Sequence, residues 1–330
     1  MKWWLIGLPL VLSAADPEFA GSAKCAGCHA AIHQAQHASR HARTLRPVAA
    51  ATEFTGPLPV VFADRVTGAE LLLSPSGGGS VDLTAKKGSE QHRLRLRWAF
   101  GSGAQAITCV GDREDGQPVE ARLTWYQSLG GFDLTTGATK HTPVNVRGSL
   151  GRELSKEELQ SCLGCHGSRV EMGVKCESCH GPGKEHIAAA GAGSHDLKIV
   201  HPGRLDAFGQ IQLCGNCHGR PPEDTDLAGL RAIENNPNTV RFASLRLVLS
   251  RCFNESAEGL KCTACHDSHR DAAREQTGYD RQCARCHDQA TRKRAALCRV
   301  AKKNCSSCHM PRAEVMAHSS FTDHWIRVTQ

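Results

Sequence analysis

The sequence has few aromatic residues and no long apolar segment. Phe, Trp and Tyr make up 5% of its 330 residues, and only two residues are Tyr. A chain of this length with so few aromatic side chains is poorly supplied for an ordinary hydrophobic core. The apolar stretch from Trp3 to Leu12 is too short to cross a bilayer, and no other stretch approaches the about 18 apolar residues required. Bound apolar groups could fill that gap, and no transmembrane segment is expected in the mature protein.

The N-terminus resembles an export signal. Met1-Lys2 precedes the apolar stretch, and Ser13-Ala14-Ala15 supplies the small residues that a signal peptidase reads. We therefore predict a signal peptide over residues 1–15 and a periplasmic or extracellular protein. An uncleaved membrane anchor is the alternative. No Cys follows the small residues directly, so a lipid anchor is not predicted.

Cysteine and histidine, by contrast, are abundant. The chain has 17 Cys and 18 His, and chance would place the pattern Cys-x-x-Cys-His in it roughly 0.05 times. The pattern occurs seven times, at Cys25–His29, Cys162–His166, Cys176–His180, Cys214–His218, Cys262–His266, Cys283–His287 and Cys305–His309. Two motifs lie within the short segment from Cys162 to His180.

The motif has a specific chemistry. Two thiols three residues apart add to the two vinyl groups of one porphyrin, and the adjacent His reaches the iron. Structural zinc would need closed sets of four ligands, and seven pairs cannot be grouped evenly in twos. We therefore predict seven covalently attached haem c groups, with zinc or disulfides as the alternatives. The attachment residues are Cys25, Cys28, Cys162, Cys165, Cys176, Cys179, Cys214, Cys217, Cys262, Cys265, Cys283, Cys286, Cys305 and Cys308, and the proximal ligands are His29, His166, His180, His218, His266, His287 and His309.

The net charge of +7 does not indicate a nucleic-acid partner. Up to two propionates per haem, which the sequence total leaves out, would bring the holoprotein near or below neutrality. We assign the excess Lys and Arg to pairing with propionates, so redox proteins are the expected partners and nucleic acid is not.

The sequence divides into three regions after the signal. Residues 16–44 form a helical segment with a single haem motif, residues 45–150 contain no motif, and residues 151–330 contain six. Arg93, Arg95 and Arg97 alternate with Leu94, Leu96 and Trp98, and Val119 to Tyr126 alternate in the same way, which is typical of half-buried strands. Ser155 and Glu158 have capping-box spacing. The predicted fold is a multihaem cytochrome c of short α-helices and loops around haems, with a small antiparallel β-domain near the N-terminus.

Eleven histidines lie outside the motifs, more than the seven needed for a second His on every iron. His33, His37 and His41 recur every four residues and should share one helix face. We expect at least one of them to ligate an iron and take His37 as a candidate; solvated surface histidines are the alternative. From the wider set we also take His201 and His318 as candidate ligands. Among the cysteines outside the motifs, Cys109 is expected to be buried, and Cys252 and Cys298 could form a disulfide.

Three segments resemble a known family. Gly173–His186, Cys262–His269 and Asn304–Pro311, the last followed by His318 and Thr322–His324, resemble exported multihaem cytochromes c related to the tetrahaem cytochrome of ammonia oxidisers, some of which carry tetratricopeptide repeats. The resemblance implies distal ligands at His41, His186, His269 and His324. Ser268 departs from the Pro common in relatives, and no repeat domain is expected after Gln330.

We therefore predict an exported heptahaem cytochrome that relays electrons between redox partners through mostly bis-His haems. Because no Cys-x-x-Cys-Lys motif is present, the best-known nitrite-reductase signature is missing. Two alternatives stay open: an oxidoreductase with one open iron acting on a small nitrogen or sulfur compound, and a subunit of an extracellular conducting filament. An electron-transfer protein is favoured over an enzyme with its own substrate.

Overall fold

The computed structural model describes residues 18–167, 170–222, 227–256, 260–273, 276–287, 298 and 303–328. The predicted signal peptide lies outside these residues. The chain divides into two compact units, Met1–Ile199 and Val200–Gln330. Within the described residues, no helix is long and apolar enough to cross a membrane.

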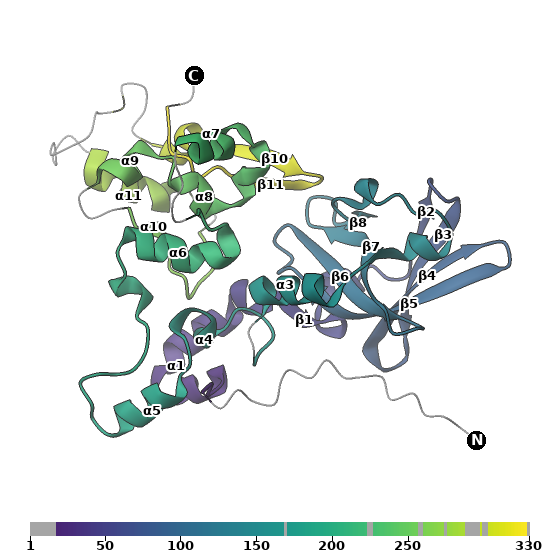
Figure 1. Cartoon of the computed structure of the whole chain (residues 1–330), viewed down its shortest axis with the longest axis horizontal. Helices are drawn as coiled ribbons and strands as arrows, with labels where there is room; N and C mark the ends of the chain where they lie inside the picture. Colours follow the sequence, from purple (N-terminus) through teal and green to yellow (C-terminus); the bar gives the residue numbers. More distant parts are fainter. Residues whose placement is uncertain are drawn as a thin grey trace. The chain divides into compact units, whose positions relative to one another are not determined.

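A nine-stranded antiparallel sheet dominates the first unit (Figure 1). Its central path runs β2-β3-β4-β5-β6-β7-β8, with β1 paired to β5 and β9 paired to β7. Each strand from β2 to β8 pairs with the next in sequence, so this path is a meander. The strands are β1 (Leu45–Pro47), β2 (Val60–Asp64), β3 (Ala69–Ser76), β4 (Ser80–Lys87), β5 (Glu90–Phe100), β6 (Ala106–Arg113), β7 (Pro118–Tyr126), β8 (Gly131–Leu134) and β9 (Gly151–Glu153).

The predicted alternation along β5 is confirmed at Leu94 and Leu96 but breaks at a bulge between Leu96 and Trp98, after which Trp98 is half-buried and Ala99 is buried. Leu94 and Leu96 are at most 1% exposed and face the core, whereas the arginines that alternate with them are partly exposed. These arginines pair with acidic residues of the neighbouring strands: Arg95 Nε lies 3.4 Å from Asp82 Oδ1, and Arg97 Nε lies 2.6 Å from Asp112 Oδ2. The row is therefore a charged outer face whose charges are compensated within the sheet.

Strand β7 is buried more completely than its alternation predicts. Val119, Ala121 and Leu123 are at most 1% exposed, as expected, but Arg122 and Thr124 are also buried. Arg122 is accommodated because its Nε lies 3.0 Å from Asp64 Oδ2, an ion pair whose two side chains are 3% and 1% exposed. The antiparallel β-region is thus confirmed, but it is larger than the small domain predicted.

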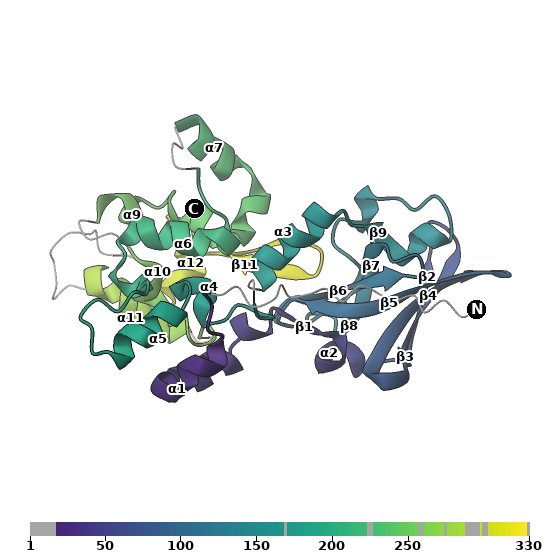
Figure 2. The same ribbon diagram turned by 60° about the horizontal axis from the view of Figure 1, so that its bottom comes forward.

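The helices of the first unit carry three haem motifs. The helices of this unit are α1 (Ser22–Ala38), α2 (Thr52–Thr55), α3 (Lys156–His166), α4 (Cys176–His180) and α5 (Lys184–Gly191). Figures 1 and 2 show α1, α4 and α5 together, away from β2, β3 and β4. The capping box at the start of α3 is confirmed, since Glu158 N donates to Ser155 Oγ and Ser155 N donates to Glu158 Oε2.

The prediction of one helix face shared by three histidines is wrong for His41. Helix α1 ends at Ala38, because Ser39 is extended (φ −73°, ψ 165°) and its backbone N–H donates to Gln36 O. His41 instead begins the short 3₁₀ helix η1 (His41–Arg43). The Ser39 hydroxyl lies 3.5 Å from Ala42 N, so this side chain bonds the backbone of the turn that replaces the helix.

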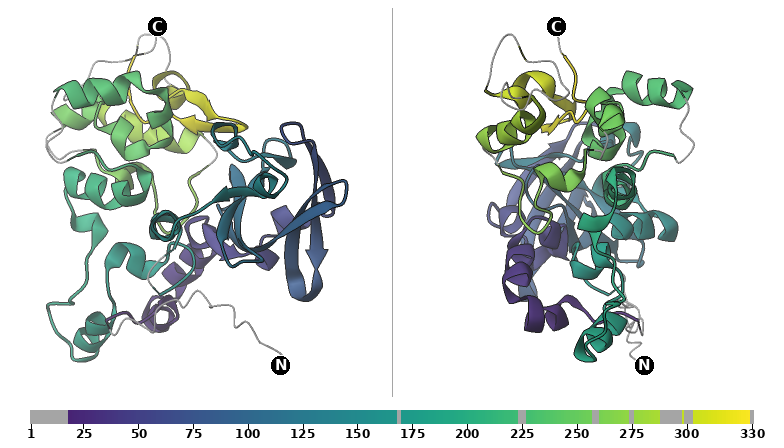
Figure 3. Two further views of the ribbon diagram at one scale, coloured as in Figure 1. Left: turned by 45° about the vertical axis from the view of Figure 1, so that its right-hand side comes forward. Right: turned by 90° about the vertical axis from the view of Figure 1, so that its left-hand side faces the viewer.

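The second unit consists of short helices and one hairpin. The helices are α6 (Ala207–His218), α7 (Leu227–Asn235), α8 (Ala243–Leu247), α9 (Arg251–Glu255), α10 (Cys262–Cys265), α11 (Gln276–His287) and α12 (Cys305–His309), and the hairpin strands are β10 (Arg312–Met316) and β11 (Ser319–Thr322). The hairpin, yellow in Figure 3, packs against the 3₁₀ helix η7 (Pro237–Arg241).

Candidate functional site

All seven motifs adopt the same local structure. The two cysteines lie on one helical turn, and the His stands where that turn ends. Helices α3, α4, α6, α11 and α12 each end on the motif His, and His266 is the C-cap of α10. In α1 the helix is kinked at His29, whose φ and ψ are −117° and 41°. The turn therefore presents both thiols and the imidazole from one short segment.

Two motif histidines face a histidine that the sequence nominates as a distal ligand. The imidazoles of His29 and His186 have ring centroids 6.3 Å apart and planes 16° apart. Those of His266 and His324 are 6.2 Å and 41° apart. The members of each pair come from distant parts of the sequence, α1 with α5 and α10 with the segment after β11.

These separations match the span of two imidazoles across one metal ion. A coordinating imidazole nitrogen lies about 2 Å from its metal, and the ring centre lies about 1.1 Å beyond the nitrogen, so two opposed ligands place their centroids about 6 Å apart. The observed 6.3 Å and 6.2 Å agree with this span. In centroid separation, both pairs thus fit two ligands of one metal ion.

In four of these histidines, a hydrogen bond at Nδ1 leaves Nε2 available to bind a metal. Nδ1 of His186 lies 2.8 Å from Leu197 O, and Nδ1 of His324 lies 3.0 Å from Thr322 O. Two motif histidines do the same: His166 Nδ1 lies 3.1 Å from Thr44 O, and His309 Nδ1 lies 2.8 Å from Arg327 O. Because a carbonyl only accepts, Nδ1 carries the proton and Nε2 keeps its lone pair, the usual arrangement of a ligating imidazole.

The second motif is inserted into the packing of the β-region. Cys162 and Leu163 pack on the apolar cluster of Leu45, Phe100, Val110, Leu154 and Leu159. The His166 ring meets the Phe100 ring edge-on at 5.4 Å. Burial lowers the pKa of His166, although its bond to Thr44 O acts in the opposite direction. The ring is therefore held neutral, as a metal ligand must be.

Cysteines of different motifs contact one another. Cys25 of the first motif is hydrogen-bonded to Cys176 of the third, and burial followed by the influence of Cys176 raises the pKa of Cys25 to about 11. Cys214 and Cys262 are also hydrogen-bonded, and this bond lowers the pKa of Cys214 to about 7. Cys283 and Cys305 form a third contact. These contacts place three pairs of thiols from different motifs side by side; once joined to haem as thioethers, the sulfurs would no longer titrate.

The other nominated histidines have different surroundings. His37 Nδ1 lies 3.3 Å from Lys175 Nζ, and its ring lies 5.6 Å from that of His33 on the same helix. His269 Nδ1 lies 3.4 Å from Asp267 Oδ1. His201 is exposed before η6 (Pro202–Arg204), and His318 adopts a left-handed φ of 59° in the turn of the hairpin. His41 opens η1. For these five the ligand role stays a prediction.

Sequence reasoning missed the buried charges that support both paired sites. Glu177, inside the third motif, is 5% exposed and accepts hydrogen bonds from the backbone leading into α1 and α5. Arg246 and Asp323 form a pair whose side chains are 4% and 3% exposed, directly before His324. The sequence signals were weak, because Glu177 occupies a variable motif position and Arg246 lies 77 residues from its partner.

The three cysteines outside the motifs have different surroundings. Cys109 is fully buried in the sheet, as predicted. The predicted disulfide between Cys252 and Cys298 is not formed. Burial raises the pKa of Cys252, and Cys286 of the sixth motif also contributes to that rise. Across the described residues, no three His, Cys, Asp or Glu side chains converge in a way that could hold a metal ion.

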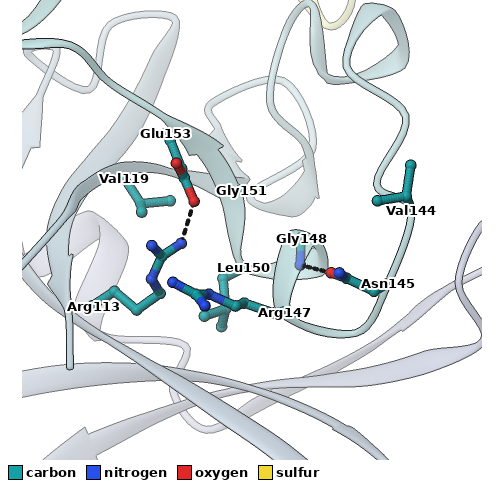
Figure 4. A pocket seen from close by; sticks show the side chains of 9 residues that line it. All are labelled: Arg113, Val119, Val144, Asn145, Arg147, Gly148, Leu150, Gly151 and Glu153. Carbon is teal, nitrogen blue, oxygen red and sulfur yellow. Dashed lines mark hydrogen bonds and ion pairs between the residues drawn. The ribbon is translucent and has the colours of Figure 1, made fainter. Parts of the chain in front are cut away.

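A cavity of about 440 Å³ lies on the β-region (Figure 4). Arg113 and Arg147 line it, but both are neutralised: Arg113 lies 2.5 Å from Glu153 and 2.7 Å from Asp115, which also pairs with Arg147 at 2.5 Å. Hydrogen bonds from Arg113 hold the pKa of Asp115 at about 2. Both arginines are thus already paired with acidic residues, and no motif residue lines the cavity.

The residues present fit covalently attached haem. Each motif offers two thiols and one imidazole from one turn, and in two places a second imidazole stands across the expected metal span. Four imidazoles have the tautomer that frees Nε2. This donor set of thioether-forming thiols and paired imidazoles is the one that haem c requires.

Comparisons with known proteins show a similarity of fold. No family model matches the chain, and no curated protein matches it. Among solved structures, the chain is similar to the crystal structure of the outer cell wall cytochrome OcwA, with a TM-score of 0.56 and 15% sequence identity. The similarity covers 94% of this chain and 80% of that one. The fold is thus similar to that of a cytochrome, and the relation to the tetrahaem cytochrome of ammonia oxidisers stays a prediction.

Proposed function

We propose that the protein is an exported cytochrome that carries haem c at its seven motifs and relays electrons between redox partner proteins. The observation that carries this proposal is the pairing of imidazoles, His29 with His186 and His266 with His324, at the span of two axial ligands. The similarity of the fold to an outer cell wall cytochrome supports it.

The side chains make these sites suited to electron transfer more than to substrate chemistry. Haem, when bound, would supply one-electron exchange, and His186 and His324 would be the second ligands that leave no open position for small molecules. The chain fixes both ligands: Leu197 O orients the ring of His186, and Thr322 O orients that of His324. An imidazole held in one orientation reorganises little when the charge at its metal changes, which favours fast exchange.

The contacts between motifs support a relay. Cys25 with Cys176, Cys214 with Cys262 and Cys283 with Cys305 join attachment points of different motifs within each unit. Groups attached at adjacent sulfurs must lie close to one another. Electrons could therefore pass between neighbouring groups without a mobile carrier.

The test combines stoichiometry with spin state. We expect seven haems per purified chain by pyridine haemochrome assay and by intact mass, and predominantly low-spin signals in electron paramagnetic resonance. His186→Ala and His324→Ala should each convert one iron to high spin. His92→Ala is the matched control, because His92 is paired with Glu90 on β5 in the motif-free region; it should leave all signals unchanged.

Two outcomes would refute the proposal. Protein without covalent haem would remove its basis, and two distal variants identical to the wild type would remove the axial pairing. A wild-type iron that binds cyanide or nitrite at neutral pH would favour the oxidoreductase alternative instead.

A further inference from the structure

Glu177 is a buried carboxylate inside the third motif, between Cys176 and Cys179. It lies on α4, and its side chain is directed away from solvent, with 5% exposure for the residue. A buried carboxylate must be compensated by hydrogen bonds or positive charge. Here the compensation comes from backbone N–H groups of two other segments.

Three backbone N–H groups donate to this carboxylate. Ala20 N lies 2.8 Å from Oε1, and Gly21 N lies 2.9 Å from Oε2; both residues lead into α1. Gly183 N, which leads into α5, lies 2.7 Å from Oε1. One side chain therefore joins the starts of the two helices that carry His29 and His186.

The bonds resemble a capping interaction supplied from outside the helix. Gly21 and Gly183 are the N-cap residues of α1 and α5, and neither has a side chain that could cap. In a capping box, a Glu of the same helix accepts from the N-cap N–H. Glu177 makes that bond for both helices at once. A Cβ at position 183 would lie 3.1 Å from Glu177 Oε1, so a side chain there would require the carboxylate to shift by a few tenths of an ångström.

One backbone bond, from Lys184 N to Glu18 O at 3.2 Å, also joins the segment before α1 to the start of α5. Ser22 N and Oγ donate to Glu171 at 3.0 Å and 2.5 Å, and Gln36 Nε2 donates to Val174 O at 2.7 Å. Both contacts hold α1 alone. Among the side-chain hydrogen bonds of the described residues, those of Glu177 reach the N-caps of α1 and α5 together.

We propose that Glu177 is a positioning residue that sets the orientation of His29 relative to His186, and so the axial geometry of the haem at the first motif. The inference rests on the proposed function. It adds that a residue of the third motif controls a ligand pair belonging to another motif. His186 is the third residue of α5, so a movement of its N-cap displaces the ring directly.

The experiment compares Glu177→Gln with wild-type holoprotein. A glutamine amide keeps the volume but replaces one acceptor oxygen by a donor, which then faces a backbone N–H. Glu185→Gln is the matched control, because Glu185 is exposed on α5 directly before His186. His186→Ala identifies by difference which low-spin resonance belongs to this haem, since that resonance depends on the angle between the imidazole planes.

We expect Glu177→Gln to retain seven haems and to shift that one resonance, with the others unchanged and Glu185→Gln identical to the wild type. A Glu177→Gln spectrum identical to the wild type, or equal shifts in several haems, would overturn the inference. If Glu177→Gln loses the first haem, Glu177→Asp decides: it keeps the charge but shortens the reach, and an unshifted resonance would overturn the inference. A His186→Ala spectrum without change would instead refute the axial pair itself.

Discussion

Removal of the Asp323 carboxylate should release the segment that carries His324. Oδ1 accepts hydrogen bonds from Arg246 Nε at 2.9 Å and Trp325 N at 3.0 Å. Oδ2 accepts from Arg246 Nη2 and from Arg327 Nη1, each at 2.8 Å. The Arg246 and Asp323 side chains are 4% and 3% exposed. All four acceptor positions of this carboxylate are thus used, within a nearly dry environment.

The expected magnitude follows from the burial. Asp323→Ala leaves the Arg246 guanidinium buried without its counter-ion, and loss of one partner of a buried pair costs about 3–5 kcal/mol. Arg246 retains bonds from Nη1 to the carbonyls of Ile233 and Glu234, which places the cost toward the lower end of that range. Since 1.4 kcal/mol is a factor of ten, local opening should become roughly 150- to 4,000-fold more frequent.

Native-state hydrogen exchange of the holoprotein measures this opening directly. Three amides report on the segment: Asp323 N bonds to Pro311 O, Arg327 N to His309 O, and Ile326 N to Ser250 Oγ. The control is Glu255→Ala, which breaks a pair of similar length, Arg251 Nε to Glu255 Oε1 at 2.7 Å, whose side chains are 85% and 60% exposed. An exposed pair of this spacing contributes about 0.3–0.5 kcal/mol, so we expect amide exchange rates in Glu255→Ala to change by about twofold at most.

A double variant separates the penalty from the value of the pair. Arg246→Met with Asp323→Leu removes both charges, and we expect exchange closer to the wild type than in Asp323→Ala, because no unpaired charge is left buried. Acceleration below tenfold in Asp323→Ala, or a double variant as unstable as the single one, would refute the reasoning.

Two further predictions concern the β-region and the cofactor. Burial would raise the pKa of Asp64, but bonds from Val66 N and Arg122 lower it on balance; its stabilising contribution is therefore complete above the unfolded value of about 3.9 and is lost as the pH falls below it. Thermal unfolding from pH 7 to pH 3 should show a smaller acid loss in Asp64→Asn, and an equal loss would contradict this. Protein produced without haem attachment should keep exchange protection in β3 to β7 but lose it in Val200–Gln330, and protection in both parts would contradict the haem-supplied core.

Local rules predicted the elements whose causes are local. The alternation of β5 was predicted because Leu94 and Leu96 lie two residues apart on one face, and the capping box of Ser155 and Glu158 requires only three residues of spacing. The end of α1 at Ala38 was missed, because Ser39 is extended without a Gly or Pro to signal it. The burial of Arg122 was missed because its partner Asp64 lies 58 residues away.

In the candidate site, too, the residues with local causes were predictable and those with long-range causes were not. The motif residues are recognisable because thiols and imidazole must be adjacent to reach one porphyrin. The position of His186 opposite His29 depends on chain folding across 157 residues, and its nomination came from a family resemblance. Glu177 illustrates the limit: its three partners lie in segments up to 157 residues distant, and its motif position tolerates many side chains.

The location of the hydrophobic core explains how the chain can fold with so few aromatic residues. Large buried side chains such as Leu71, Leu83 and Leu123 belong to the sheet, which contains no motif. In the described part of Val200–Gln330, the buried apolar side chains are Ala207, Ile211, Val240 and Leu247. Four such side chains bury too little apolar area to offset the conformational entropy of ordering that unit. The same unit carries four of the seven motifs, so the shortage of apolar side chains coincides with the places where porphyrin rings would supply the missing apolar surface.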